Sequence, residues 1–321
     1  AAPCDCPAVP AAAQVEDAVR KLREEQAVAS AASGAKAIPE PPPPRPEYKL
    51  RPVQQNGIHS VLITGAAGFI GSHMALLLMD KGGFKVTAVD DMSRSSWDTV
   101  LRLQHLAEAT QGSDFTFVKQ DLADAPAMSK LMRDNSVDAV VHFAGNAYVG
   151  ESMKAPDKYF QNITVGTLQL LKAMDDAGVQ NLIFSSSCAT FGEPKEFPIT
   201  ELTPQLPTNP YGLSKLHAEQ SILEKARVRR KNGQRFAVSS LRYFNVIGAD
   251  PMGRLGPVLK HKEQWEFPRI VDAAIDAALG LRAKLQVMGG DFPTPDGTAV
   301  RDYIHVTDLV QAHLDALVRL D

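Results

Sequence analysis

The segment Val61-Leu-Ile-Thr-Gly65-Ala-Ala-Gly68-Phe-Ile-Gly71 decides how this chain folds. A short run of apolar and β-branched residues predicts a strand, and glycines spaced G-x-x-G-x-x-G follow it and lead into a helical pattern. Glycines permit a tight turn and let backbone N–H groups approach an anion at the N-terminus of a helix. The segment therefore predicts a strand, a phosphate-binding turn and a helix in that order.

Beyond this segment, short runs rich in Val, Ile and Phe alternate with longer helical patterns, which is typical of a parallel sheet built from βαβ units. The expected strands are Ser60–Thr64, Lys85–Val89, Thr116–Lys119, Ala139–Phe143, Asn181–Ser185 and Ala237–Tyr243. The expected helices are Phe69–Lys81, Pro156–Ala177, Tyr211–Val228, one around Pro268–Gly280 and one beginning near Val306. The predicted fold class is α/β: a Rossmann doubly wound parallel sheet with a smaller and incomplete C-terminal lobe.

Composition narrows the classes of partner. The chain has 321 residues and a formal net charge of −3, so it carries no basic footprint for nucleic acid. No apolar run approaches the roughly 20 residues that span a bilayer, which predicts a soluble protein of the cytoplasm or of an organelle such as the chloroplast. Cys4, Cys6 and Cys188 fit neither a disulfide framework nor a zinc site. Small molecules or other proteins are the expected partners.

Acidic residues at the ends of the next two strands extend the dinucleotide pattern. Asp90 lies about 20 residues beyond the last glycine, where a ribose 2′-hydroxyl needs an acceptor. Its carboxylate would repel a 2′-phosphate and so favours NAD over NADP, although Arg94 nearby weakens that preference. Asp121 is expected either to accept from the adenine amino group or to cap its strand. His142 is interpreted as structural, and the small residues after it let the chain pass close to the cofactor.

A second constellation suggests the chemistry. Ser187 closes the fifth strand, and Tyr211 and Lys215 lie four residues apart at the start of a helix that Pro210 opens. An ammonium beside a phenol favours the phenolate, so Tyr211 is a candidate base and Ser187 a candidate partner for the same substrate oxygen. A Tyr-x-x-x-Lys pair alone is common on exposed helices. The glycine turn upstream makes the catalytic interpretation the stronger one.

From Ile58 to Asp321 the chain resembles the extended short-chain dehydrogenases/reductases, and within them the nucleotide-sugar 4-epimerases. The stretches that carry the resemblance are Thr64–Gly71, His142–Gly145, Val149–Ser152, Phe184–Gly192, Asn209–Gly212, Leu241–Asn245 and Asp296–His305. Residues 147–152, 188–194 and 245–256 are most similar to plant and algal UDP-arabinose 4-epimerases, followed by UDP-glucose 4-epimerases.

The resemblance implies an isomerase that inverts C4 of a UDP-sugar, either UDP-xylose/UDP-arabinose or UDP-glucose/UDP-galactose. NAD would be its cofactor, and the reaction would pass through a transient 4-keto sugar without net redox change. The implied catalytic residues are Ser187, Tyr211 and Lys215, with no metal. The implied NAD contacts are Gly65, Gly68, Phe69, Ile70, Gly71, Asp90, Asp91, Asp121, Leu122, Phe143, Ala144, Gly145, Asn162, Tyr211, Lys215 and Tyr243. The implied substrate contacts are Ser187, Tyr211, Asn245 and Arg301.

Three segments are expected on this interpretation. Residues 1–57 form an Ala/Pro-rich leader, either disordered or a tether that docks a protein partner, with an extended proline run at Pro39–Pro46. Residues 58–245 form the NAD-binding Rossmann domain, and residues 246–321 form a partial substrate-binding lobe with returning Rossmann elements. The resemblance also implies a homodimer through a helix pair.

The chain departs from the family pattern at three places. Ala147 replaces a lysine that bacterial-type glucose epimerases place beside the pyrophosphate, and Ser187 stands where plant arabinose epimerases tend to have Thr. The chain ends at Asp321, where the family continues with another diphosphate-binding arginine. Two alternatives stay open: a nucleotide-sugar dehydratase or decarboxylase, and a catalytically weak subunit of a larger assembly. Cys188-Ala189 argues against a 4,6-dehydratase, which would have Asp-Glu there.

Overall fold

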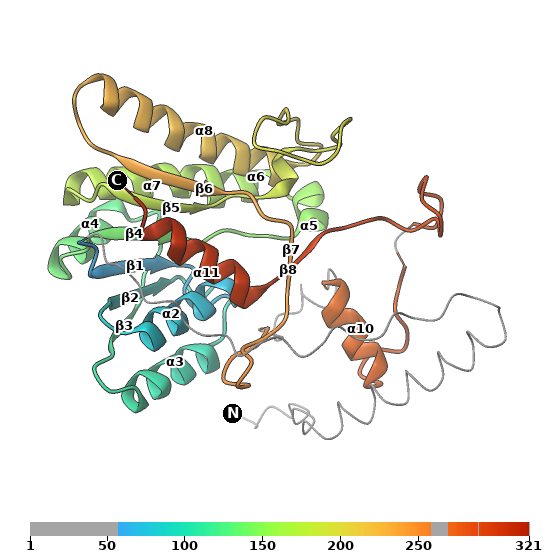
Figure 1. Ribbon diagram of the computed structural model, residues 1–321, viewed down its shortest axis with the longest axis horizontal. Helices are drawn as coiled ribbons and strands as arrows, with labels where there is room; N and C mark the ends of the chain where they lie inside the picture. Colours follow the sequence, from blue (N-terminus) through green and yellow to red (C-terminus); the bar gives the residue numbers. More distant parts are fainter. Residues whose placement is uncertain (1–56, 258–268, 288, 321) are drawn as a thin grey trace. The chain divides into compact units, whose positions relative to one another are not determined.

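The computed structural model describes residues 57–257, 269–287 and 289–320 (Figure 1). The predicted leader lies outside the described residues, apart from Gly57. The described residues fall into two compact units, one of 57–257 with 301–320 and one of 269–300. No helix among them is long and apolar enough to cross a membrane.

The larger unit is built on a six-stranded sheet with the order β3-β2-β1-β4-β5-β6, in which every neighbouring pair is parallel. Its strands are β1 (Ser60–Thr64), β2 (Lys85–Asp90), β3 (Asp114–Lys119), β4 (Ala139–His142), β5 (Asn181–Ser185) and β6 (Ala237–Leu241). The order reverses direction between β1 and β4, which makes their carboxyl ends a topological switch point. The predicted doubly wound α/β fold is confirmed.

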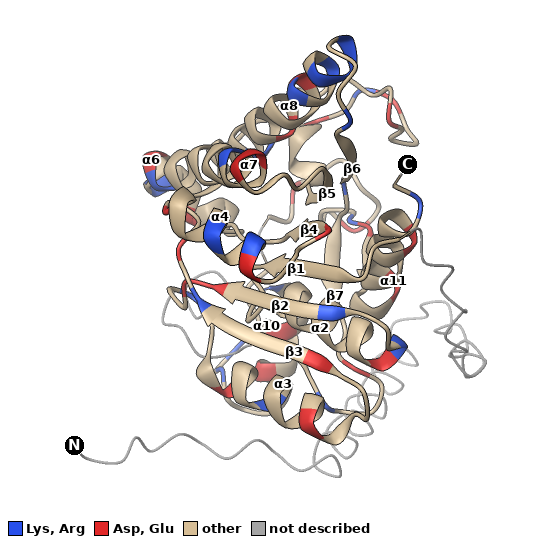
Figure 2. Cartoon of the chain, turned by 90° about the vertical axis from the view of Figure 1, so that its left-hand side faces the viewer, with Lys and Arg blue, Asp and Glu red and all other residues tan. Residues whose placement is uncertain are grey.

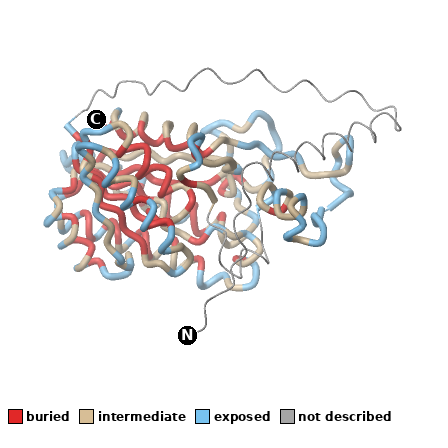
Figure 3. Tube along the Cα trace, turned by 90° about the horizontal axis from the view of Figure 1, so that it is seen from below, coloured by how far each residue is buried: buried red, intermediate tan, exposed pale blue. Residues whose placement is uncertain are grey.

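Burial on both faces explains why the inner strands β1, β4 and β5 are mostly apolar. Successive residues of β1 point to opposite faces, so Val61 and Ile63 enter one hydrophobic cluster while Leu62 enters the other. The buried residues gather in the interior of the larger unit (Figure 3). The inner strands are almost entirely uncharged, whereas charges of both signs are spread over the helices (Figure 2). Apolar packing therefore stabilises the sheet, and the polar residues lie mainly at the ends of its strands and on the helices.

Helices cover both faces. The helices α2 (Phe69–Lys81), α3 (Trp97–Ala109) and α11 (Val306–Leu317) bury residues in the first cluster, and α4 (Ala125–Asp134), α7 (Gly166–Ala177) and α8 (Pro210–Lys231) in the second. The helix predicted over Pro156–Ala177 is wrong in detail, because α6 (Pro156–Tyr159) is separated from α7 by a π-helical turn at Phe160–Val165. The short helix α5 (Val149–Lys154) precedes α6.

Two further strands carry the chain after the sheet. β7 (Asn245–Ile247) pairs in parallel with β8 (Tyr303–His305), and α11 begins directly after β8. Helix α11 packs on α2, so the last described segment returns to the sheet of the larger unit. In the smaller unit, α10 (Ile270–Ala278) confirms the helix expected around Pro268–Gly280.

Candidate functional site

The glycine turn after β1 is packed tightly against its neighbours. Gly65 has a φ of +67°, and a Cβ added to it would lie 2.7 Å from the backbone nitrogen of Ala144 in the loop after β4. A Cβ on Gly71, in the first turn of α2, would lie 2.2 Å from the Gly65 carbonyl oxygen. Gly68 begins α2 in an extended conformation and offers no side-chain cap. A helix N-terminus without a side-chain cap, pressed against a glycine turn, fits a phosphate group.

Asp90 ties the end of β2 to this turn. Its buried carboxylate accepts hydrogen bonds from Ala67 N at 3.0 Å, Met92 N at 2.9 Å and Ser95 Oγ at 2.8 Å. Burial raises the pKa of Asp90, and these hydrogen bonds oppose that shift. The structure thus places the predicted ribose acceptor beside the glycine turn.

The other predicted acidic contacts lie in exposed turns. Asp91 accepts from Ser93 N at 2.8 Å, and Asp121 accepts from Ala123 N at 2.9 Å. Each carboxylate therefore caps its own turn, which for Asp121 is the second of the two predicted roles. The contact of Asp121 with adenine stays a prediction. The NAD contacts of Phe69 and Ile70, in the first turn of α2, and of Leu122, beside Asp121, also stay predictions.

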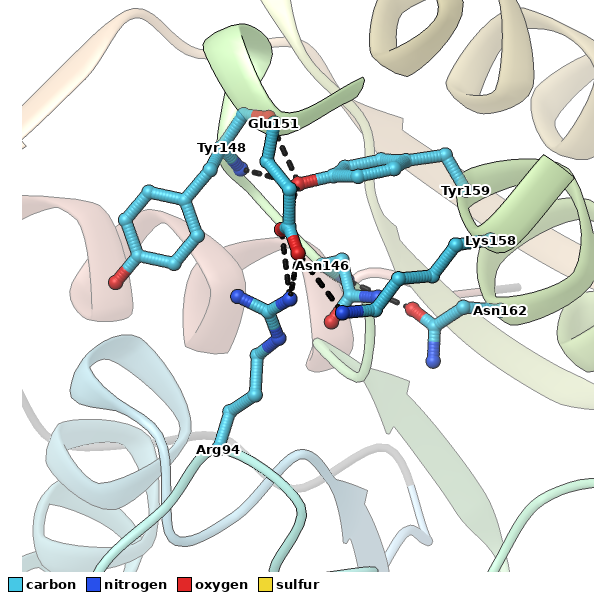
Figure 4. Close-up of polar contacts among 7 residues, drawn as sticks. All are labelled: Arg94, Asn146, Tyr148, Glu151, Lys158, Tyr159 and Asn162. Atoms are coloured by element: carbon cyan, nitrogen blue, oxygen red, sulfur yellow. Dashed lines mark hydrogen bonds and ion pairs between the residues drawn. The ribbon is translucent and has the colours of Figure 1, made fainter. Parts of the chain in front are cut away.

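An ion-pair network, absent from the predicted site, joins the loop after β2 to α5 (Figure 4). Arg94 Nη2 donates to both carboxylate oxygens of Glu151 at 2.6 Å, and the guanidinium lies 5.4 Å from the centre of the Tyr148 ring. Lys158 Nζ and Tyr159 Oη donate to the same carboxylate at 2.8 and 2.7 Å. Burial opposes ionisation of Glu151, but the hydrogen bonds from Lys158, Tyr159 and Arg94 lower its pKa to about 2.

A separate hydrogen bond near this network holds the end of the predicted cofactor loop. Asn162, in the π-helical turn, accepts from Asn146 N at 2.7 Å through its side-chain oxygen (Figure 4). The loop after β4, which contains Phe143, Ala144 and Gly145, therefore lies between the glycine turn and the π-helical turn. A Cβ added to Gly145 would lie 3.5 Å from Lys215 Nζ, which joins the cofactor loop to the predicted catalytic lysine.

His142 is held in a directed chain of buried hydrogen bonds. Thr167 Oγ1 donates to Ile163 O at 2.6 Å, so it accepts from His142 Nε2 at 3.1 Å. His142 Nδ1 then accepts from Thr64 Oγ1 at 2.7 Å. Burial, with a contribution from Lys215, lowers its pKa to about 3 and keeps the ring neutral. This arrangement agrees with the structural role predicted for His142.

Lys215 is the most deeply placed of the predicted catalytic residues. Its Nζ is buried, donates to Ser185 O at 2.8 Å and lies 5.0 Å from the centre of the Phe184 ring. Burial lowers its pKa to about 8. Tyr211 lies one turn earlier on α8, where its ring packs edge-on against Tyr159 at 6.2 Å. The ammonium and the phenol therefore project from one face of the helix.

The turn that carries Ser187 lies against the start of α8. Ser187 Oγ accepts from Ala189 N at 3.1 Å. A Cβ added to Gly212 would lie 2.4 Å from Ala189 O, so only glycine lets the helix approach this turn so closely. Asn209 caps the helix by accepting from Gly212 N at 2.8 Å. The structure thus brings the predicted Ser187 and Tyr211 segments together.

Glu219 was missed by the sequence analysis. It lies one turn beyond Lys215 on α8, is 1% exposed, and accepts from Arg242 Nε at 2.9 Å and Ser186 Oγ at 2.5 Å. These contacts join α8 to the carboxyl ends of β5 and β6. The available signal was an acidic residue at i+4 from Lys215 on the same helical face.

The last three predicted residues follow β6. Tyr243 Oη is hydrogen-bonded to Ser185 Oγ, and its carbonyl accepts from Cys188 N at 3.0 Å. Asn245 Nδ2 donates to Asp302 O at 2.9 Å from the edge of the β7–β8 pair. Arg301 is exposed. Its positive charge opposes the rise that burial causes in the pKa of the Cys188 thiol, so Arg301 lies toward the turn that carries Ser187. Substrate contacts of Asn245 and Arg301 stay predictions.

Comparison with known proteins adds to this geometry. A family model described as the NAD dependent epimerase/dehydratase family matches residues 61–321. The chain is 48% identical over 280 residues to the probable UDP-arabinose 4-epimerase 1 of Oryza sativa subsp. japonica, covering 87% of this chain and 65% of that protein. It is 51% identical over 261 residues to the UDP-arabinose 4-epimerase 1 of Arabidopsis thaliana, covering 81% of this chain and 60% of that protein. The chain thus spans 60 to 65% of the length of these curated relatives.

A solved structure shares the fold. The UDP-glucose-4-epimerase from Stenotrophomonas maltophila, crystallised with bound NAD and formylated UDP-arabinopyranose, is 40% identical and superposes with a TM-score of 0.73. The match covers 81% of this chain and 73% of that one.

Proposed function

The chain belongs to the NAD-dependent epimerase/dehydratase family, and from that membership we propose that it inverts C4 of a UDP-sugar, with NAD as cofactor, through a transient 4-keto sugar. The substrate pair that we expect first is UDP-arabinose and UDP-xylose, because the relatives at 48 and 51% identity are named UDP-arabinose 4-epimerases. The UDP-glucose and UDP-galactose pair is the alternative for the same chemistry.

One observation carries this proposal: a buried lysine, hydrogen-bonded to the end of β5, lies one helical turn from a tyrosine. Lys215 Nζ is fixed by Ser185 O at 2.8 Å and stays protonated at neutral pH, since its pKa is about 8. A fixed positive charge at this place stabilises negative charge on the Tyr211 oxygen. Tyr211 would then accept the proton of the sugar 4-hydroxyl and return it to the 4-keto sugar after the sugar has turned.

The residues at the carboxyl edge suit the dinucleotide. The uncapped N-terminus of α2 would take the pyrophosphate, and Asp90, beside the glycine turn, would accept from the ribose hydroxyls. When bound, NAD supplies the hydride acceptor and then the hydride donor of the reaction. The chain's own residues orient the sugar and handle the proton: Ser187 would hold the oxygen at C4, and Arg301 would meet the diphosphate.

The test is interconversion of sugars without added reductant. We would incubate the 321-residue chain separately with UDP-arabinose, UDP-xylose, UDP-glucose and UDP-galactose and follow each by chromatography. We expect one pair to equilibrate, Tyr211→Phe to abolish the exchange, and Tyr303→Phe, an exposed tyrosine on β8, to leave it unchanged. Absence of exchange in all four incubations, with NAD shown to be bound, would refute the proposal.

A further inference from the structure

The Arg94–Glu151 ion pair joins the two halves of the sheet. Arg94 belongs to the loop after β2 and Glu151 to α5, after β4, while β1 with its glycine turn lies between β2 and β4. A bridge from the end of β2 to the end of β4 therefore spans the carboxyl end of β1. Ligands of doubly wound sheets bind at this switch point, so the pair spans the place where a dinucleotide would lie.

The geometry of the pair is that of a specific contact. One guanidinium nitrogen bonds both carboxylate oxygens at 2.6 Å, and the side chains of Arg94 and Glu151 are 19% and 13% exposed. Lys158 and Tyr159 hold the same carboxylate from α6, which is on the Glu151 side of the switch point. Of these three donors, Arg94 alone comes from the β2 side. Lys158 and Tyr159 therefore fix the Glu151 carboxylate from the β4 side, and Arg94 bonds it from the β2 side.

A second observation points to a ligand. Nη1 of Arg94 is buried and has no hydrogen-bond partner within the described part of the chain. A buried N–H group without an acceptor is costly, and a guanidinium next to a dinucleotide site can donate to a hydroxyl or phosphate oxygen. Asp90 and Ser95, hydrogen-bonded to each other, place the same loop beside the glycine turn.

We propose that Arg94 and Glu151 form a latch that closes over the bound dinucleotide and slows its release. The inference rests on the proposed function, because an epimerase regenerates its cofactor in each cycle and has no need to exchange it. Glu151 is the fixed half of the latch, and Arg94 is the half that must move for the dinucleotide to leave. Glu151 is a positioning residue, and Arg94 would contact the dinucleotide without taking part in the proton transfer.

The experiment measures cofactor release without any sugar. The protein is loaded with NADH, chased with an excess of NAD⁺, and the rate constant for release is read from the loss of bound-NADH fluorescence. We expect Arg94→Met and Glu151→Gln each to raise this rate constant about tenfold, because either variant removes the bond that holds the latch closed and a tenfold change corresponds to about 1.4 kcal/mol. The double variant should release NADH no faster than the faster single variant.

Lys158→Met is the matched control, because Lys158 bonds the same carboxylate without crossing the switch point. We expect it to change the rate constant less than twofold. Arg94→Lys, which keeps the charge but loses the planar guanidinium and its Nη1, should give an intermediate rate and stays informative if Arg94→Met does not fold. Release at the wild-type rate from Arg94→Met and Arg94→Lys, or equally fast release from Lys158→Met, would overturn the proposal. Fast release from Arg94→Met in a protein that interconverts no UDP-sugar would keep the latch and reject the epimerase.

Discussion

Replacing Lys215 by Met should make the protein more stable at neutral pH while abolishing its chemistry. Burial lowers the Lys215 pKa from 10.5 to about 8, which corresponds to a cost of about 3 kcal/mol for carrying the charged form into the folded state. Methionine removes that cost but also loses the hydrogen bond to Ser185 O, worth about 1 kcal/mol. We therefore expect Lys215→Met to raise the free energy of unfolding by about 2 kcal/mol at pH 7.

The pH dependence gives the sharper test, and its sign follows from proton binding. Below pH 8 lysine is charged in both states and the full cost is present. Between pH 8 and 10.5 the folded state has lost the proton while the unfolded state keeps it, so wild-type stability rises with pH. The advantage of Lys215→Met should therefore shrink over this window and reverse near its upper end, where the wild type becomes more stable by the hydrogen bond to Ser185 O, about 1 kcal/mol.

The assay is chemical denaturation of the NAD-free protein at pH values from 7 to about 10, the range set by the two pKa values. Lys130→Met, at a lysine 71% exposed on α4, controls for the general effect of losing a lysine. A Lys215→Met variant that is less stable than wild type at pH 7, by an amount that does not change up to pH 10, would refute the reasoning.

Three further predictions concern the frame around the site. Gly71→Ala places a methyl group 2.2 Å from a backbone oxygen, so we expect a loss of about 1–3 kcal/mol in unfolding free energy and of bound NAD. In Gly166→Ala the added methyl group would lie 3.9 Å from its nearest neighbour, so we expect neither the unfolding free energy nor the NAD content to change. Denaturation and the measured NAD content of both variants check this difference. Glu219→Ala leaves the partly exposed Arg242 without its buried carboxylate, so we expect a loss of about 3 kcal/mol in unfolding free energy by denaturation, with the exposed Glu224→Ala as control; a loss below about 1 kcal/mol would contradict a stabilising Glu219–Arg242 pair. His142 titrates only near pH 3, so wild-type stability should fall by about 1.4 kcal/mol per pH unit for this group below pH 6.5, and a shallower acid slope in His142→Gln checks it.

Most of the sheet could be predicted because its inner strands are buried on both faces. Val61–Ile63, for example, is a continuous apolar run, and the predicted strand ends lie within two residues of those observed. Helices α3 and α4 were not predicted, since α3 buries only Thr99, Val100 and Leu103 and leaves a weak apolar period. The π-helical turn at Phe160–Val165 was read as ordinary helix, because a single widened turn has the same residue preferences as its surroundings.

The residues of the candidate site also fall into two groups, those that the sequence predicts and those that it does not. Residues in short motifs, such as Gly65 and Lys215, are recognisable because a few neighbours fix their conformation. The partners that hold the site together are far apart in the sequence: Arg94 and Glu151 are separated by 57 residues, and Glu219 and Arg242 by 23. The local sequence does not indicate which charged residues will form a pair, because the strand order of the sheet determines which of them lie close together.

The way each buried charge is compensated separates structural from chemical roles. Asp90 accepts from two backbone N–H groups and a hydroxyl, and Glu219 is paired with Arg242 and Ser186. Lys215 has one carbonyl oxygen as its hydrogen-bond partner in the described part of the chain and no carboxylate. Folding alone gives no reason to bury an ammonium with so little compensation, since methionine would fill the same space at lower cost. A buried charge that destabilises the folded protein is best explained by a reaction that needs it. The Lys215 ammonium would act on Tyr211, one helical turn away.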